Sequence, residues 1–233
     1  MASSIIHLAI AKKVAEAFPI KNQKDYYLGS IAPDISKQIG LDKEKSHFLI
    51  HTKNDIPNIP LFIKRYPYFY HNSFDFGYFV HLYTDKLWGE EFLPNIVKND
   101  TVHLLNGKSI KMSQNEITNM IYSDYTSLNI DIIDEYELDL SLFYEEFSPP
   151  ETRIQEIPTD KLDILLNKMG IIIENSKNKK AYTFNKDIIN TFIKNTSKKI
   201  IEEINHQNNH LNYLLHNQSF HLPFQDFSDK YHK

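Results

Sequence analysis

The apolar segment from residue 77 to residue 88 contains two residues that can bind a metal ion. It reads GYFVHLYTDKLW, and its histidine and aspartate are His81 and Asp85. Residues four positions apart lie on one face of a helix. Because this helix is apolar on nearly every side, we expect it to be buried, and a buried carboxylate needs a partner. That partner is a divalent metal ion, a hydrogen bond from His81, or a lysine or arginine elsewhere in the chain.

Three more residues of ligand type lie in apolar surroundings earlier in the chain. Each has a simpler interpretation: His7 as a core histidine bonded to a carbonyl, Asp34 as a helix N-cap, and His47 as a half-buried surface histidine. Together with His81 and Asp85 they form a nitrogen and oxygen ligand set that suits zinc, or manganese or iron. The set as a whole therefore favours a metal centre.

The composition narrows the chemistry that the chain can perform. The 233 residues are 41% hydrophobic, which is enough for one sizeable core. The chain has no cysteine, which excludes thiol nucleophiles, disulfides and thiolate-bound zinc or iron–sulfur clusters. Phosphate-binding glycine loops and a nucleophile elbow are also missing from the sequence. Any metal site must therefore consist of histidines and carboxylates.

Net charge and hydropathy give general expectations about binding partners and cellular location. The net charge of −4 indicates no strong attraction to nucleic acid or to an anionic membrane. The N-terminal stretch MASSIIHLAIAKKVAEAF has its lysines after the apolar part, so we expect a first helix and no signal peptide. No apolar run is long enough for a transmembrane segment. These observations predict a cytoplasmic location.

The periodicity of apolar residues predicts a mainly helical chain. Residues 95–112 lack a helical pattern and are consistent with a loop, and 170–184 with a loop or a small hairpin. The three prolines of 148–158 indicate a linker before a C-terminal helical part of one domain, 1–233. A short segment around 45–51 is expected within 42–53. Helical segments are predicted at 4–18, 25–36 (breaking at Gly29 into a loop), 58–71, 74–94, 113–123, 127–133, 135–147, 159–169 and 185–217.

Four segments in order carry a resemblance to a known family. The segments HLAIA, YLGSIAPD, SHF and GYFVHLYTD resemble the zinc-dependent phospholipase C family, which is related more distantly to S1/P1-type nucleases. The resemblance covers about the first 90 residues well and the rest only as a helical pattern. It implies an all-α, compact multi-helix phospholipase C/P1 nuclease-like fold.

The resemblance also implies a mechanism. His7, Asp34, His47, His81 and Asp85 would bind two zinc ions, with Asp85 bridging them, and manganese or iron as the alternative metals. A metal-bound hydroxide would attack phosphorus in line. Asp34 would also serve as the general base, so that Asp34 and Asp85 are the expected catalytic residues.

The sequence departs from the family pattern at two places. Secreted members use their N-terminal residue as a ligand, whereas Met1 here precedes His7 by six residues. Members also carry a His–His–Glu set for a third metal, but the stretch 89–94, GEEFLP, has no histidine. The third site is therefore expected to be absent or rebuilt. The candidates for additional ligands are His51, Glu91, His103 and Asp124.

The remaining polar and aromatic clusters have simpler interpretations. His206 and His210 are spaced like a metal pair, but their surroundings are polar and predict a solvated helix face. Arg65, Lys86 and Arg153 could bind phosphate, although charged surface residues are usually solvated. The aromatic stripe 66–70 is more typical of a core than of a lipid or base pocket.

Two functions remain open from the sequence. The favoured one is a metal-dependent phosphoester or phosphodiester hydrolase, and the alternative is a helical binding or scaffold protein that retains a structural metal site. A phosphohydrolase of the HD superfamily needs an adjacent His-Asp pair, which this sequence lacks. The expected substrate is a small-molecule or lipid phosphoester. Nucleic acid is not indicated by the charge.

Overall fold

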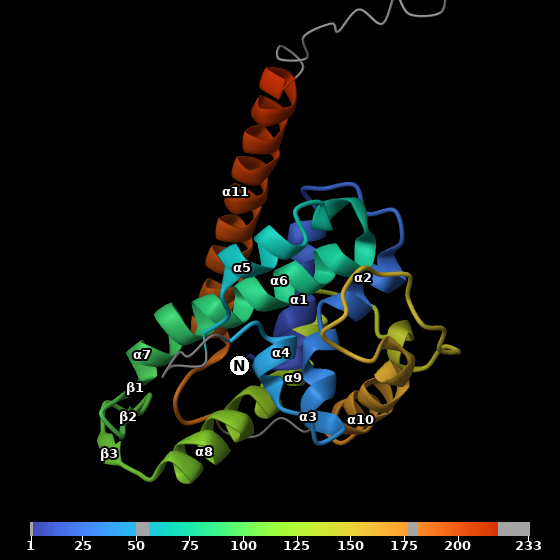
Figure 1. The fold of residues 1–233 in the computed structure, drawn as a ribbon. Coiled ribbons are helices and arrows are strands. Elements are labelled where there is room, and N and C mark those ends of the chain that lie inside the picture. Colours follow the sequence, from blue (N-terminus) through green and yellow to red (C-terminus); the bar gives the residue numbers. More distant parts are fainter. Residues whose placement is uncertain (1, 50–55, 177–180, 219–233) are drawn as a thin grey trace, which may run out of the picture.

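Helices α1 (Ser4–Ala15) and α6 (Ser73–Leu87) lie at the centre of the molecule (Figure 1). The computed structural model describes residues 2–49, 56–176 and 181–218, with side chains described up to residue 207. The Ser3 side chain caps α1 by accepting a hydrogen bond from the Ile6 N–H, and Asn72 caps α6 through the Asp75 N–H. Both helices are buried along most of their length, as the all-round apolar pattern predicts.

Two glycines let α6 cross closely over α2 (Gln23–Gly29). A methyl group on Gly77 would collide with the Tyr26 carbonyl and come within 2.8 Å of the Ser30 nitrogen. One on Gly29 would collide with the Phe74 carbonyl. The two backbones therefore touch at a distance that only glycine permits. This contact sets the Ser30 carbonyl against α6.

The chain between α2 and α6 forms short helices. They are η1 (Ala32–Asp34), α3 (Ile35–Gln38), α4 (Lys43–Ser46), α5 (Ile59–Arg65) and η2 (Phe69–His71). The predicted end of the helix at Gly29 is confirmed, but the loop expected after it is wrong, because η1 and α3 form there. The single helix predicted over 58–71 is wrong: α5 ends at Arg65, because Pro67 disfavours a helical conformation at Tyr66.

Helix α6 continues through a π-helical turn, Trp88–Phe92, into α7 (Leu93–Ile96). The loop expected over 95–112 is wrong, because a small antiparallel sheet occupies this stretch. Its strands are β1 (Val97–Lys98), β2 (Thr101–His103) and β3 (Ser109–Lys111), in the order β1-β2-β3. Val102 pairs with Val97 and Ile110 and is fully buried. Strands of two or three residues are too short to give a periodic signal.

The second half of the chain is again helical. Helices α8 (Gln114–Ser127) and α9 (Asn129–Glu135) agree with the prediction, whereas the helix predicted over 135–147 is wrong. Only η4 (Ser141–Phe143) forms there, after Glu137 takes a left-handed conformation with φ of 45°. The chain then forms η5 (Thr159–Lys161), α10 (Leu162–Glu174) and α11 (Lys186–Gln218).

The predicted linker 148–158 lies against the body of the protein. Ile154 and Ile157 are buried, and Glu156 accepts a hydrogen bond from the Tyr66 hydroxyl at 2.6 Å. Helix α10 packs against α3, and α11 packs against α1 and α6. The C-terminal helices therefore share a core with the N-terminal ones.

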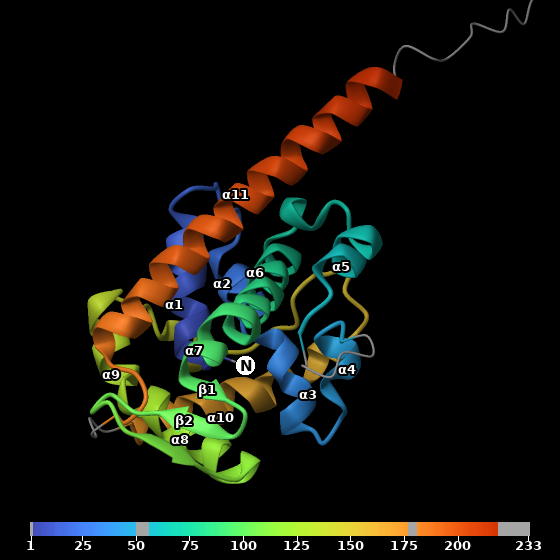
Figure 2. The ribbon, with the colours of Figure 1, turned by 90° about the vertical axis from the view of Figure 1, so that its left-hand side faces the viewer.

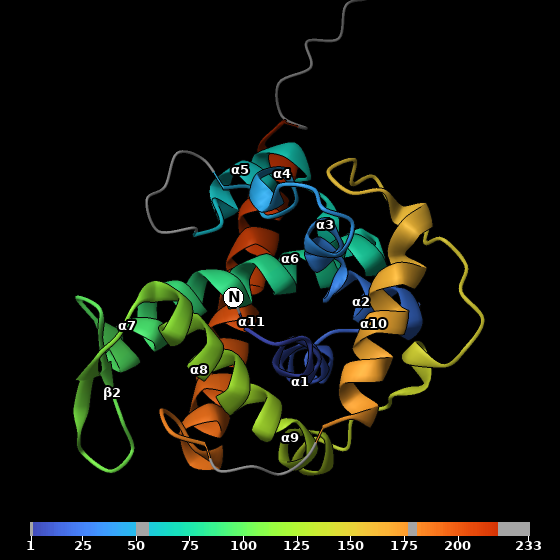
Figure 3. The ribbon, with the colours of Figure 1, turned by 90° about the horizontal axis from the view of Figure 1, so that it is seen from below.

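Helix α11 is the longest element, and its C-terminal half extends past the other helices (Figures 1 and 2). Seen from below, α8, α9 and α10 surround one end of α1 (Figure 3). No helix within the described ranges is both long and apolar enough to cross a membrane.

Candidate metal centre

The structure brings all five predicted ligands to one place between α1, α4 and α6. His7 comes from α1, and His81 and Asp85 come from consecutive turns of α6. Asp34 ends η1 and His47 follows the last residue of α4. The side chains of the three histidines and Asp85 are at most 2% exposed, whereas that of Asp34 is 13% exposed.

Two short elements aim Asp34 and His47 at the centre. The Asp34 carboxylate makes no capping hydrogen bond at the start of α3, so the simple N-cap interpretation does not hold. His47 stands at the C-terminus of α4, and the next residue, Phe48, turns the chain with a φ of 54°. A positive φ is strained for a bulky residue. Packing of the Phe48 ring on Phe62, 5.2 Å between centroids, stabilises this turn.

The Asp85 carboxylate lies in the middle of the group. Its Oδ1 is 3.3 Å from His7 Nε2, and its Oδ2 is 3.4 Å from His81 Nε2 and 3.6 Å from His47 Nε2. Asp34 Oδ1 is 3.6 Å from His47 Nε2. Ligand atoms of His7, Asp34 and His81, and likewise of His47, His81 and Asp85, all lie within 4.8 Å of one another. Each of these two groups is large enough to hold one ion.

Hydrogen bonds outside the centre set the tautomers of two histidines. His81 Nδ1 lies 2.9 Å from the Ser30 carbonyl, which can only accept, so this nitrogen carries the proton. His47 Nδ1 lies 2.9 Å from Ser46 Oγ, whose own hydroxyl donates to the Lys43 carbonyl. Both Nε2 atoms therefore carry lone pairs. This is the arrangement that outer hydrogen bonds impose on metal-binding histidines.

The inner atoms lack the partners that a metal-free explanation requires. The two Nε2 lone pairs of His47 and His81 face each other at 3.3 Å. His7 Nε2, Asp34 Oδ1 and Asp85 Oδ2 are buried with no hydrogen-bond partner among the described residues. No described lysine or arginine forms an ion pair with Asp85, whose only ionic neighbours there are histidines. The donor set therefore fits one or two divalent cations.

The charges of the centre also favour a cation. Burial, together with the neighbouring His81, lowers the pKa of His7 to about 4, so His7 is neutral at pH 7. Burial alone would raise the pKa of Asp85 and Asp34. The contacts and charges of the histidines instead hold the pKa of both carboxyls below their usual range. Likewise, burial alone would lower the pKa of His81, but Asp85 raises it. Two ionised carboxylates thus lie beside three histidines, and no described lysine or arginine forms an ion pair with either of them.

One contact of the centre was not predicted from the sequence. The main-chain N–H of Ala2, a buried residue, donates to Asp85 Oδ1 at 3.0 Å. Secreted members of the family that the chain resembles use their N-terminal residue as a metal ligand, and the sequence departs from this pattern. Here the N-terminal segment contacts the Asp85 carboxylate of the centre, as a hydrogen-bond donor. Eighty-three positions separate the two residues, so no spacing pattern could reveal the contact.

The low-ranked candidates lie elsewhere. Glu91 forms an ion pair with Lys199 at 2.6 Å, and His103 is exposed on β2 beside Ser109. Asp124 is buried but accepts hydrogen bonds from the backbone N–H groups of residues 182 and 183. His51 lies outside the described residues, as does the side chain of His210. Two of the three residues considered for phosphate binding, Arg65 and Lys86, form ion pairs with Glu156 and Glu90.

Comparison with protein families matches residues 6–128, just over half of the chain, to the family described as zinc dependent phospholipase C. The chain belongs to this family. The matched segment contains all five residues of the metal centre. Membership in the zinc-dependent phospholipase C family supports hydrolysis of phosphoesters as the general chemistry, with zinc as the metal. The comparisons found no match among curated proteins or solved structures.

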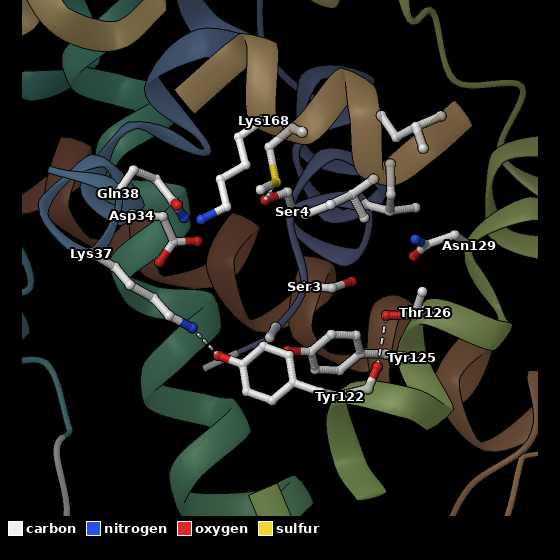
Figure 4. Close-up of a pocket in the computed structure, with 15 residues that line it drawn as sticks. Ser3, Ser4, Asp34, Lys37, Gln38, Tyr122, Tyr125, Thr126, Asn129 and Lys168 are labelled. Atoms are coloured by element: carbon white, nitrogen blue, oxygen red, sulfur yellow. Dashed lines mark hydrogen bonds between the residues drawn. The ribbon is translucent and has the colours of Figure 1, made fainter. Parts of the chain in front are cut away.

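A cavity of about 170 Å³ adjoins the metal centre and is bordered by Asp34 (Figure 4). Asp34 is the one member of the five that lines it. The other walls come from the start of α1, from α3, from α8 and from α10. Substrate can therefore approach the centre from the side of Asp34.

Proposed function

We propose that this protein is a metal-dependent phosphodiester hydrolase. His7, Asp34, His47, His81 and Asp85 would hold two zinc ions, with Asp85 bridging them. The observation that carries this proposal is the pair of Nε2 lone pairs that face each other at 3.3 Å, beside carboxylate oxygens of Asp34 and Asp85 that have no hydrogen-bond partner among the described residues. A bound divalent cation removes this repulsion.

The two carboxylates have different surroundings, which supports different roles. Asp85 contacts three histidines and the Ala2 N–H, so its oxygens are committed to holding the centre. Asp34 borders the cavity, is partly exposed and stays ionised at neutral pH. Asp34 is therefore placed to accept a proton from an attacking water molecule.

The reaction follows from this placement. A bound zinc ion would lower the pKa of water and neutralise charge on the phosphoryl oxygens. Asp34 takes one proton from water as the water oxygen forms a bond to phosphorus. The bond from phosphorus to the leaving oxygen breaks, and the leaving oxygen takes up the proton that Asp34 received from water, which returns Asp34 to its ionised form. The buried histidines keep the site rigid during this exchange.

The alternative, a scaffold with a structural metal, would need a site closed by protein ligands. Four of the five side chains are almost fully buried, which suits a structural site. The exposure of Asp34 and the adjoining cavity favour an enzyme, because a catalytic metal keeps a position open for water or substrate.

The test measures metal content and turnover on the same preparations. We expect stoichiometric zinc in the purified protein and hydrolysis of bis(4-nitrophenyl) phosphate, with both lost in His81→Ala. The matched control is His103→Ala, an exposed histidine on β2, which should retain both. Reconstitution of metal-free protein with Zn²⁺, Mn²⁺ or Fe²⁺ shows which of these ions restores turnover. Protein that neither contains nor takes up a transition metal would contradict the proposal.

We expect a small-molecule or lipid phosphoester as the substrate, in keeping with the family. The cytoplasmic location expected from the sequence and the organisation as one domain stay predictions. Fractionation of cells that express the chain would test the location.

A further inference from the structure

The cavity beside Asp34 has two chemically different halves (Figure 4). On one side, Asp34, Gln38 and Lys168 point toward one another, and Lys37 lies beside them with its ammonium group at the Tyr122 hydroxyl. The rest of the lining is mostly apolar, with Met169, Ile172 and Ile173 of α10 and Ile5 of α1, and it also includes the polar side chains of Ser3, Thr126 and Asn129. A ligand that fills both halves must have a polar and an apolar part.

The polar half carries an excess of positive charge. Lys37 Nζ lies 2.5 Å from the Tyr122 hydroxyl and 4.6 Å from the centre of its ring, so a neutral residue holds it at the cavity. Lys168 forms no ion pair with any described residue, and in Figure 4 its ammonium group points toward Asp34 and Gln38. Asp34, the only carboxylate among the described residues that line the cavity, faces the metal centre. Two lysines thus remain to attract an anion.

The apolar half limits the size of the other part. A cavity of about 150 Å³ lined by aliphatic and aromatic residues is known to bind benzene. The whole cavity here measures about 170 Å³. It therefore accepts one group about the size of a single ring, and the two acyl chains of a diacylglycerol would have to lie outside it.

The wall of the cavity that α10 forms lies outside the segment that matches the family. The family match ends at residue 128, whereas Lys168, Met169 and Ile172 belong to α10. Part of the charge of the cavity and much of its apolar lining therefore come from a helix outside the matched segment.

We propose that the cavity selects phosphoesters that carry an additional negative charge and one small apolar group, with Lys37 and Lys168 as the charge-selecting residues. This inference rests on the proposed hydrolase function for its kinetic consequences. Its recognition part can be measured without hydrolysis.

The kinetic experiment uses three 4-nitrophenyl phosphodiesters that differ in the second ester group: 2-carboxyethyl, propyl and 2-(trimethylammonio)ethyl. With zinc-loaded protein, we expect kcat/KM to fall in that order. Lys37→Met and Lys168→Met each keep the length of the side chain and remove its charge. Because both lysines are exposed and screened by solvent, each variant should lower kcat/KM for the carboxyethyl ester by about fivefold and leave the propyl ester nearly unchanged. Lys98→Met, an exposed lysine on β1, is the control without effect.

The binding experiment uses phenylphosphonate, which has a dianionic head, a single ring and no ester bond to cleave. Calorimetry should show that it binds wild-type protein, that benzyl alcohol binds much more weakly, and that both lysine variants lose about fivefold in affinity. Added salt should weaken binding of phenylphosphonate to wild-type protein. Circular dichroism of each variant checks that the fold is retained.

The outcomes separate the two proposals. Equal kcat/KM for the three esters, unchanged in both lysine variants, overturns the charge selection and leaves the hydrolase function intact. Absence of hydrolysis together with lysine-dependent binding of phenylphosphonate overturns the hydrolase function and supports the recognition site. Absence of both overturns both proposals.

Discussion

The partners of the histidines outside the centre decide which nitrogen faces inward. The Ser30 carbonyl accepts a hydrogen bond from His81 Nδ1–H, and Ser46 Oγ accepts one from His47 Nδ1–H. The sequence shows the ligand types and their order, and all five predicted ligands meet in the structure. It does not show the outer partners, because a backbone carbonyl has no sequence signature and a serine before a histidine is common.

Two buried aspartates allow a matched test at the residue scale. We expect Asp85→Asn to lower zinc affinity by more than about 100-fold, because an amide cannot supply the negative charge or bridge two ions. Asp124→Asn should leave zinc content unchanged and lower the free energy of unfolding by about 2–4 kcal/mol, since its neighbours at residues 182 and 183 lose an acceptor. Elemental analysis and urea unfolding measure the two effects. Zinc bound at wild-type levels in Asp85→Asn would contradict the assignment.

The outer partner of His47 gives a second test at this scale. Ser46→Ala removes the acceptor that holds the Nδ1 proton, and we expect zinc affinity to fall about 10- to 100-fold with little change in fold. Ser127→Ala is the control, because this buried serine bonds only to a carbonyl of its own helix. Competition with a zinc chelator of known affinity measures both. Equal affinities in the two variants would show that Ser46 does not orient His47.

At the scale of elements, the crossing of α2 over α6 positions the centre. Gly29 and Gly77 bring the Ser30 carbonyl against His81. The prediction that the first helix of this pair ends at Gly29 is confirmed, but it rested only on residues within that segment and not on the contact with α6. The packing role of both glycines depends on which helix faces which, and periodicity within one helix does not contain that information.

Substitution of the crossing glycine should therefore affect both stability and the metal centre. Gly77→Ala places a methyl group against the backbone at Tyr26 and Ser30, which cannot yield as a side chain can. We expect a loss of about 2–3 kcal/mol in the free energy of unfolding and weaker zinc binding. Gly170→Ala is the control, because its nearest neighbours would lie at 3.8 Å, and alanine should stabilise helix α10 by up to about 1 kcal/mol. Denaturant unfolding with and without zinc tests both, and an unaffected Gly77→Ala would contradict the close crossing.

At the scale of the whole molecule, the five ligands join segments that are distant in the chain. His7 belongs to α1, His47 directly follows α4 and Asp85 belongs to α6, so bound metal would link these three elements. The buried carboxylates repel each other without it. Folding and metal binding should therefore be strongly coupled.

Removal of the metal tests this coupling. Zinc at about 1,000 times its dissociation constant adds about 4 kcal/mol to the free energy of unfolding. For a chain of this size, that corresponds to roughly 10 °C in Tm. We expect dialysis against a chelator to lower Tm by that amount and zinc to restore it, with no response in His81→Ala. A Tm that is independent of chelator in the wild type would show that the ions do not hold these elements together.

The sequence by itself predicted the helical class, a buried helix over 74–94 and, with the family resemblance, the five residues that meet at the centre, because apolar periodicity and residue type are local properties. The small sheet at 97–111 escaped prediction because short strands have no period. The end of α5 before Tyr66 escaped it although Pro67 disfavours a helical conformation there. Only the tertiary structure decided that Ala2 contacts Asp85, that Asp124 has a structural partner, and that α10 brings Lys168 to the cavity beside Asp34. These contacts join residues far apart in the chain, and the packing of helices against one another creates them.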